Sequence, residues 1–254
     1  MADGLQGTVA LVTGASSGIG EATALDLAAR GAAVAIAARR KERLDALARQ
    51  IEGGGGRALV VECDVTDQEQ AKALVARTVE GLGRLDTVIN NAGIMLLGPI
   101  VDAPTEEWDR MIALNLQGLL YVAHAALPHL LDAAATDPRH VADLVNISSV
   151  AGRVARTGSG VYNLTKHGVG AFSESLRQEV TSRHVRVSLV EPGAVETELT
   201  DHLRDEIRPV LESRFGSMER MAATDIADAI AYIVTRPRHV AINELLVRPT
   251  EQEG

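Results

Sequence analysis

The stretch TGASSGIG, Thr13 to Gly20, decides the fold of this chain, because it joins a short apolar run to an amphipathic one. Val9 to Val12 precede it and read as a buried strand, whereas Ile19 to Arg30 follow it and read as a helix. Glycines let the backbone approach a bound group closely, and a helix N-terminus offers unpaired N–H groups with partial positive charge. The stretch therefore predicts an anion-binding loop, with a plain strand-to-helix turn as the alternative interpretation.

The same alternation continues outward from this loop and predicts βαβ units around a parallel sheet. Strands are expected at Val9–Val12, Val34–Ala38, Ala58–Glu62, Thr87–Asn90, Ala142–Ile147, Val185–Val190 and Glu244–Val247. Helices are expected over Ile19–Arg30, Lys41–Glu52, Asp67–Leu82, Thr105–Leu131, Val161–Arg183 and Thr224–Thr235. Because no Pro-, Gly- or Ser-rich linker separates these units, residues 1–254 are expected to form one α/β domain.

Charge and cysteine content narrow the class of protein. The chain has 25 Lys and Arg against 34 Asp and Glu, and the resulting formal charge of −9 opposes binding to nucleic acid or anionic membranes. Cys63 is the single cysteine and cannot form an internal disulfide, and no signal-type segment opens the sequence.

The apolar run Leu116–Leu131 contains Pro128 and two histidines, so we expect it not to span a bilayer. A cytoplasmic protein with a small-molecule substrate is expected, and the histidines show no metal-ligand spacing.

The end of the second predicted strand decides which nucleotide the loop would hold. An acidic side chain there would accept hydrogen bonds from a free ribose 2′-hydroxyl, but this sequence has Ala38 followed by Arg39, Arg40 and Lys41. Cations suit a 2′-phosphate, so the position predicts NADP(H). The alternative interpretation is a solvated basic start of a helix. Asp64, after the third strand, is expected either to bind adenine or to cap the following helix.

A second group of residues carries the chemistry. Tyr162 and Lys166 stand four apart and so share one face of their predicted helix. A phenol with a pKa of about 10 transfers protons poorly near neutrality. An ammonium about 5 Å away would stabilise the phenolate by roughly 3 kcal/mol at an effective dielectric of 20. Ser149 ends a strand at the same sheet edge as the loop and could donate a hydrogen bond to a substrate oxygen, or merely satisfy loop backbone.

Together TGASSGIG, the NNAG of Asn90–Gly93, Ser149 with YNLTK, and EPGAVET resemble the short-chain dehydrogenase/reductase family over essentially the whole chain. The resemblance implies a three-layer Rossmann-type fold with a seven-stranded parallel sheet, and hydride transfer between NADP(H) and a carbonyl or alcohol. It implies the catalytic set Asn115, Ser149, Tyr162 and Lys166, in which Asn115 holds a proton-relay water through its helix. The cofactor-binding residues are then Gly14, Ser16, Ser17, Gly18, Ile19, Gly20, Arg39, Arg40, Asp64, Val65, Asn91, Ala92, Gly93, Tyr162, Lys166, Pro192, Gly193, Val195 and Thr197.

The substrate pocket is expected to be lined by Met95, Leu96, Leu97, Val150 and Val154, and closed by a segment at about 197–218. Arg153 borders the same loop and is expected either to pair with a substrate carboxylate or to be solvated. The tail Glu244–Gln252 resembles the branch that contains NADP-dependent 3-hydroxy-acid and serine dehydrogenases. The motifs NNAGIMLLGP, ALPHLL and FSESLRQEV, together with the ending Arg248-Pro249-Thr250, resemble still more closely clavulanate dehydrogenases, which act on an aldehyde beside a carboxylate.

Three alternatives to a reductase of small aldehydes or ketones stay open. Two are enzymes, a 3-oxoacyl-carrier-protein reductase and an NAD-dependent hydroxysteroid dehydrogenase. The third is an NADP-binding sensor without activity, which the intact Ser149, Tyr162, Lys166 and Asn115 disfavour. The resemblance also implies a homo-oligomer, a tetramer or a dimer, whose subunits pack through Leu116–Leu131 and Val161–Arg183.

Overall fold

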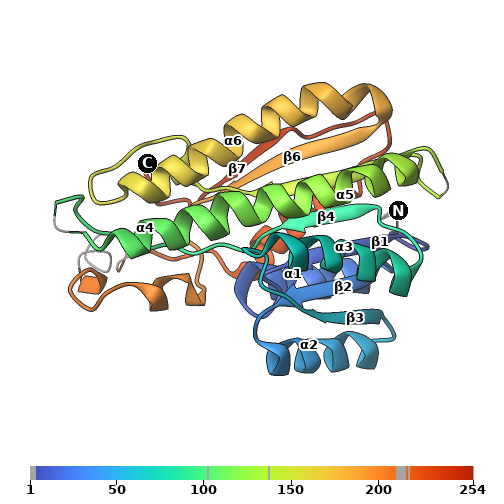
Figure 1. Cartoon of the computed structure of the whole chain (residues 1–254), viewed down its shortest axis with the longest axis horizontal. Coiled ribbons are helices and arrows are strands. Elements are labelled where there is room, and N and C mark those ends of the chain that lie inside the picture. The colour runs from blue at the N-terminus through green and yellow to red at the C-terminus, as the bar shows by residue number, and fades with distance from the viewer. Residues whose placement is uncertain (1–3, 102, 137, 210–215, 217, 254) are drawn as a thin grey trace.

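Seven parallel strands form one sheet in the computed structural model, which describes residues 4–101, 103–136, 138–209, 216 and 218–253 (Figure 1). The strand order is β3-β2-β1-β4-β5-β6-β7, so the direction of winding reverses between β1 and β4. The carboxyl ends of these two central strands form the switch point at which doubly wound sheets bind ligands. The strands are β1 (Val9–Thr13), β2 (Ala33–Ala38), β3 (Arg57–Glu62), β4 (Thr87–Asn90), β5 (Ala142–Ile147), β6 (Val185–Pro192) and β7 (Glu244–Val247).

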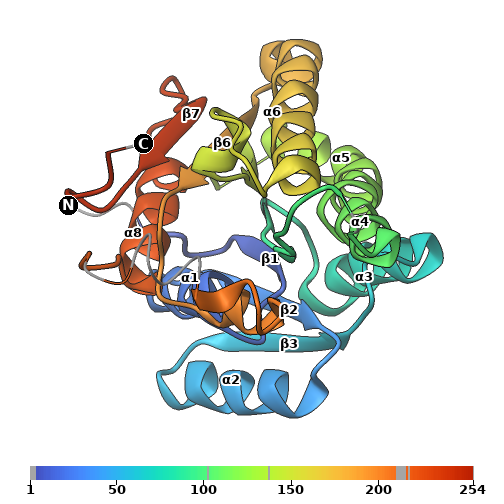
Figure 2. The same ribbon diagram turned by 90° about the vertical axis from the view of Figure 1, so that its left-hand side faces the viewer.

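Helices cover both faces of the sheet, which gives the three-layer Rossmann-type fold (Figures 1 and 2). One layer consists of α1 (Gly18–Ala29), α2 (Lys41–Gly53) and α8 (Ala223–Val234). The other consists of α3 (Gln68–Leu82), α4 (Thr105–Ile112), α5 (Leu119–Ala134) and α6 (Gly160–Val180). Each layer has its own aliphatic core against the sheet, for example Leu27 and Ile230 on one side and Leu74 and Leu130 on the other.

The helix predicted over Thr105–Leu131 is a continuous run from Thr105 to Ala134 whose middle, Ala113–Gly118, is π-helical. One-turn π segments inside α-helices are frequent at functional sites, and Asn115 lies in this one. Pro128 lies within α5 and does not end it, in agreement with the helix expected over Thr105–Leu131. By length and composition alone this run could cross a membrane, a property that it shares with the core helices of soluble proteins.

Element ends differ from the sequence prediction by a few residues. The last three residues of the helix predicted to Arg183 form a separate 3-10 turn, Thr181–Arg183, after α6. Asp67 caps α3 by accepting hydrogen bonds from the backbone N–H groups of Glu69 and Gln70. This excludes Asp64 from the capping role that one interpretation gave it.

Candidate active site

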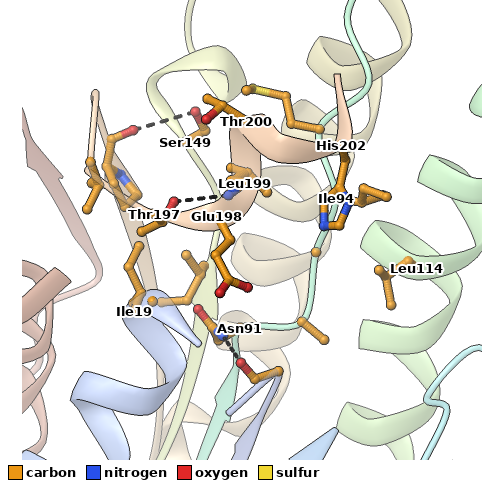
Figure 3. Close-up of a pocket in the computed structure, with 18 of the residues that line it drawn as sticks. Ile19, Asn91, Ile94, Leu114, Ser149, Thr197, Glu198, Leu199, Thr200 and His202 are labelled. Carbon is orange, nitrogen blue, oxygen red and sulfur yellow. Dashed lines mark hydrogen bonds between the residues drawn. The ribbon is translucent and has the colours of Figure 1, made fainter. Parts of the chain in front are cut away.

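A cavity of about 410 Å³ opens at the carboxyl ends of the strands (Figure 3). It brings together most of the predicted site: Gly14, Ser16, Ser17, Gly18, Ile19, Arg39, Arg40, Asp64, Val65, Asn91, Ala92, Gly93, Met95, Leu97, Ser149, Val150, Tyr162, Lys166, Pro192, Gly193, Val195 and Thr197. Five predicted residues are not among those that line it: Gly20, Leu96, Asn115, Arg153 and Val154.

The glycine loop between β1 and α1 fits a phosphate group. Gly14 and Gly18 have φ angles of 65° and 58°, which L side chains rarely adopt. A Cβ at Gly14 would also lie 2.8 Å from the Cα of Ala92, so the loop and the segment after β4 can approach this closely only because residue 14 is glycine. The Ser17 side chain does not cap the start of α1, which leaves the first N–H groups of this helix available to an anion.

Asn91 clamps this loop to the end of β4. Its Nδ2 donates to the carbonyl oxygens of Thr13 and Gly14 at 3.0 and 3.2 Å, and Figure 3 shows one of these two bonds. Gly20 lies behind the loop, where a Cβ would be 2.4 Å from the Gly14 carbonyl oxygen. Gly20 therefore supports the loop by close packing and does not line the pocket.

Arg40, more than Arg39, reaches the loop. Its Nη2 donates to the Oγ atoms of Ser16 and Ser17 at 2.9 and 2.7 Å, and its Nη1 forms a 2.8 Å ion pair with Glu198. The Arg39 side chain is 70% exposed and lies 3.9 Å from the Asp64 carboxylate. The basic cluster thus borders the pocket, and of the two predicted arginines Arg40 makes the direct contact with the phosphate loop.

Tyr162 and Lys166 lie on α6 and are both 6% exposed. The Lys166 Nζ donates to the carbonyl oxygen of Ile147 at 2.9 Å and is 5.8 Å from the centre of the Tyr162 ring. Burial raises the pKa of Tyr162 to about 12, while the Ser149 side chain acts to lower it. Burial lowers the pKa of Lys166 to about 8. The raised pKa of Tyr162 differs from the lowered pKa expected from the sequence. Without a bound cofactor, desolvation disfavours the phenolate more than the neighbouring groups stabilise it.

Ser149 and Asn115 are held by backbone contacts. The Ser149 hydroxyl accepts from the Ala151 N–H at 3.1 Å and points to the Pro192 carbonyl oxygen at 3.5 Å (Figure 3). Asn115, which is buried, accepts from the Ile94 N–H at 2.8 Å and donates to the Ile94 carbonyl oxygen at 2.9 Å. Asn115 therefore joins the π-helical turn to the strand-end segment that lines the pocket, without lining it itself.

Three residues predicted on the substrate side do not line the cavity. Arg153 is turned away from the pocket, because its guanidinium pairs with the buried Glu191 at 2.5 Å and with Glu244. Leu96 is buried in a small core with Met111 and Tyr162. Val154 is 42% exposed on the surface.

Several lining residues were not predicted, among them Arg156, Ser159, Arg220 and Gln252, whereas Glu198 and His202 belong to the predicted closing segment. Arg156 is fixed through Asn163, which accepts from the Arg156 N–H at 3.2 Å and donates to the Ala151 and Val154 carbonyl oxygens. Arg156 could have been predicted as a lining residue, because it lies three residues after Arg153 on the loop expected to border the pocket. Gln252 could not, because it is held at the site by a contact distant in sequence, in which its amide oxygen accepts from the Ala194 N–H at 2.9 Å.

The segment predicted to close the pocket is described only in part. Thr197 accepts from the Leu199 N–H at 3.4 Å and begins a 3-10 helix, Glu198–His202. Glu198, Leu199, Thr200 and His202 line the cavity and follow Thr197 along one wall of it (Figure 3). Residues 210–215 and 217 of the predicted segment lie outside the described residues.

The sequence profile of the short chain dehydrogenase family matches residues 8–208. The chain belongs to this family and is a dehydrogenase/reductase. It is 39% identical over 241 residues to an uncharacterized oxidoreductase of Staphylococcus aureus (strain USA300), an alignment that covers 95% of this chain and 96% of the relative.

Solved structures of similar chains have the same fold. A closed form of serine dehydrogenase complexed with NADP+ superposes with a TM-score of 0.88 at 30% identity, covering 97% of each chain. A metagenomic short-chain oxidoreductase in complex with NADP gives a TM-score of 0.80 at 33% identity, covering 98% of this chain and 99% of that one.

Proposed function

We propose that the protein is an NADPH-dependent reductase of a small aldehyde or ketone, reversible as an alcohol dehydrogenase. One observation carries the proposal: Tyr162 and Lys166 line the same cavity as a phosphate-binding loop that Arg40 contacts. A proton-transfer group, a buried cation and a nucleotide cradle in one pocket fit hydride transfer to a carbonyl. The NADP bound in both solved relatives supports the choice of cofactor.

The residues of the pocket can be given roles. NADPH supplies a hydride when it is bound. The open N-terminus of α1 and the backbone of Gly14 and Gly18 would hold its pyrophosphate, and Arg40 with Ser16 would hold its 2′-phosphate. Lys166 would bind the nicotinamide ribose, and Val195 and Thr197 the carboxamide, as the family resemblance implies.

Tyr162 would donate the proton to the substrate oxygen. A phenol whose pKa is raised to about 12 stays protonated at neutral pH, which suits an acid in the reduction direction. The oxidation direction requires the phenolate, so a positive charge must then lower this pKa. Ser149 would turn from the Pro192 carbonyl oxygen to donate to the substrate oxygen as negative charge develops there. Asn115 positions the segment at Ile94 and so the wall beside Tyr162.

Substrate choice can be tested with a panel of aldehydes and ketones, followed by the loss of NADPH absorbance. The proposal predicts turnover of at least one member with NADPH, and the reverse reaction with its alcohol and NADP+ at higher pH. Binding of NADPH without turnover of any carbonyl in a broad panel would instead support a sensor that keeps the fold without the chemistry.

We also propose that the protein is a homo-oligomer. Leu120 on α5 and Leu164 on α6 are 38% and 57% exposed, on the two helices through which the family resemblance implies that subunits pack. Light scattering of the purified protein distinguishes a monomer from a dimer or tetramer, and Leu164→Glu should shift an oligomer toward smaller species.

A further inference from the structure

The basic cluster beside the phosphate loop is opposed by acids at every position. Arg39 lies 3.9 Å from Asp64, Arg40 forms a 2.8 Å ion pair with Glu198, and Lys41 pairs with Asp45 at 2.7 Å. A 2′-phosphate that enters this cluster therefore meets arginines that already have carboxylate partners.

Glu198 is the acid best placed to affect binding of a 2′-phosphate. It directly follows Thr197, lines the cavity and bridges two arginines, Arg40 and Arg43. The two guanidinium groups, Arg43 first, lower the pKa of Glu198 to about 2, so its carboxylate is charged at neutral pH. Among the described residues that line the cavity, Asp64 is the only other acid, and it lies farther from its arginine.

The contacts of Arg40 divide between two sides. Its Nε and Nη2 face the serine hydroxyls of the loop, whereas its Nη1 faces Glu198. A phosphate dianion bound at the serines would share the guanidinium with a carboxylate of the same sign. A cofactor with a free 2′-hydroxyl adds no charge there and meets no such repulsion.

We propose that Glu198 is a specificity-determining residue, whose carboxylate competes with the 2′-phosphate for Arg40 and so limits the preference for NADPH over NADH. This inference rests on the proposed function. It also connects cofactor choice with the segment that begins at Thr197, because the same acid ties that segment to the basic cluster.

The test compares the dissociation constants of NADPH and NADH, measured by fluorescence titration of the full-length protein. Glu198→Gln keeps the shape of the side chain and removes its charge. NADPH should bind roughly two- to fivefold more tightly to this variant, the range for partly exposed charge pairs, while NADH binding stays unchanged. The gain should shrink as salt is raised, because the charges are solvent-accessible.

Asp45→Asn is the matched control. It removes the same charge from an exposed ion pair on α2, at a residue that does not line the cavity, and should alter neither dissociation constant. An unchanged NADPH-to-NADH ratio in Glu198→Gln, an equal loss of both affinities, or the same gain in Asp45→Asn overturns the inference. In each of these cases a wild type that still prefers NADPH leaves the proposed function standing. A wild type that does not prefer NADPH contradicts the proposed cofactor and the inference together.

Discussion

The ammonium nitrogen of Lys166 lies 5.8 Å from the centre of the Tyr162 ring, and both side chains are almost fully buried. Burial moves the two pKa values in opposite directions, to about 8 for Lys166 and about 12 for Tyr162. At neutral pH the site therefore holds a neutral phenol beside a desolvated cation. A desolvated cation lowers the folding stability of the cofactor-free protein. Such a cost is common where a charged group serves a bound ligand.

The first prediction follows from the lowered pKa of Lys166. The unfolded lysine has a pKa of 10.5 and the folded one about 8, so between these values the unfolded state binds more protons. The contribution of Lys166 to folding stability should therefore rise with pH from about 8 to about 10.5, by about 3 kcal/mol. Lys166→Met has no such group, so the free energy of unfolding of wild type minus variant should rise over this range.

Denaturant titrations of the cofactor-free proteins at several pH values measure this difference. Tyr162 acts with the opposite sign above pH 10, since its folded pKa is raised, but it is present in both proteins and largely cancels. Parallel stability curves for the two proteins would show that Lys166 is not a desolvated cation.

The second prediction separates the two arginines of the cofactor pocket. Arg40→Leu should lose most of the preference for NADPH over NADH, because Arg40 alone of the pair contacts Ser16 and Ser17. Charge-assisted hydrogen bonds contribute about 1.5 to 3 kcal/mol, which corresponds to roughly tenfold to a hundredfold in kcat/KM for NADPH. Arg39→Leu is the matched control and should retain more of the preference, since its side chain is largely solvated. A larger loss of the NADPH preference in Arg39→Leu than in Arg40→Leu would assign 2′-phosphate binding mainly to Arg39.

The third prediction concerns Arg153, which pairs with the buried Glu191. Arg153→Met should lower the free energy of unfolding by about 1 to 3 kcal/mol at neutral pH, because it leaves a buried carboxylate without its cation. Burial raises the pKa of Glu191, so the loss should shrink in acid as this side chain becomes protonated.

The double variant Arg153→Met, Glu191→Gln removes the stranded charge and should recover part of the loss. KM values for aldehydes with and without a carboxylate should change alike in Arg153→Met, since this arginine does not line the pocket. A selective rise in KM for carboxylated substrates would restore the substrate-binding role that the structure argues against.

The fold could be predicted from local sequence because its signals are local. The alternation of apolar runs and helices, and the glycine loop after Val9–Val12, place all seven strands within a few residues of their positions. Side-chain direction could not be predicted in this way. Whether Arg39 or Arg40 meets the loop depends on how α2 begins, and Arg153 turns away because Glu191 and Glu244 on β6 and β7 attract it.

The predicted catalytic residues also combine a feature that local sequence predicts, their position on one helix face, with one that it does not, the pKa of Tyr162. Their spacing placed Tyr162 and Lys166 on one helical face, which the structure confirms. The pKa of Tyr162 is raised because residues distant in sequence bury it, so the spacing of Tyr162 and Lys166 could not predict the direction of this shift. Glu198 lies in the predicted closing segment. Its ion pair with Arg40 could not be predicted, because the two residues are distant in the sequence.

We propose above that Tyr162 transfers the proton in a reaction that uses NADPH. Tyr162→Phe keeps the ring and removes only the hydroxyl, so NADPH should bind nearly as tightly as in the wild type. Turnover of the best carbonyl substrate should fall by about 10²- to 10⁴-fold. Tyr121→Phe, on α5 and outside the pocket lining, is the control and should remain active. The most direct measurement is kcat with saturating NADPH: a Tyr162→Phe enzyme that kept more than about a tenth of wild-type turnover would contradict the account.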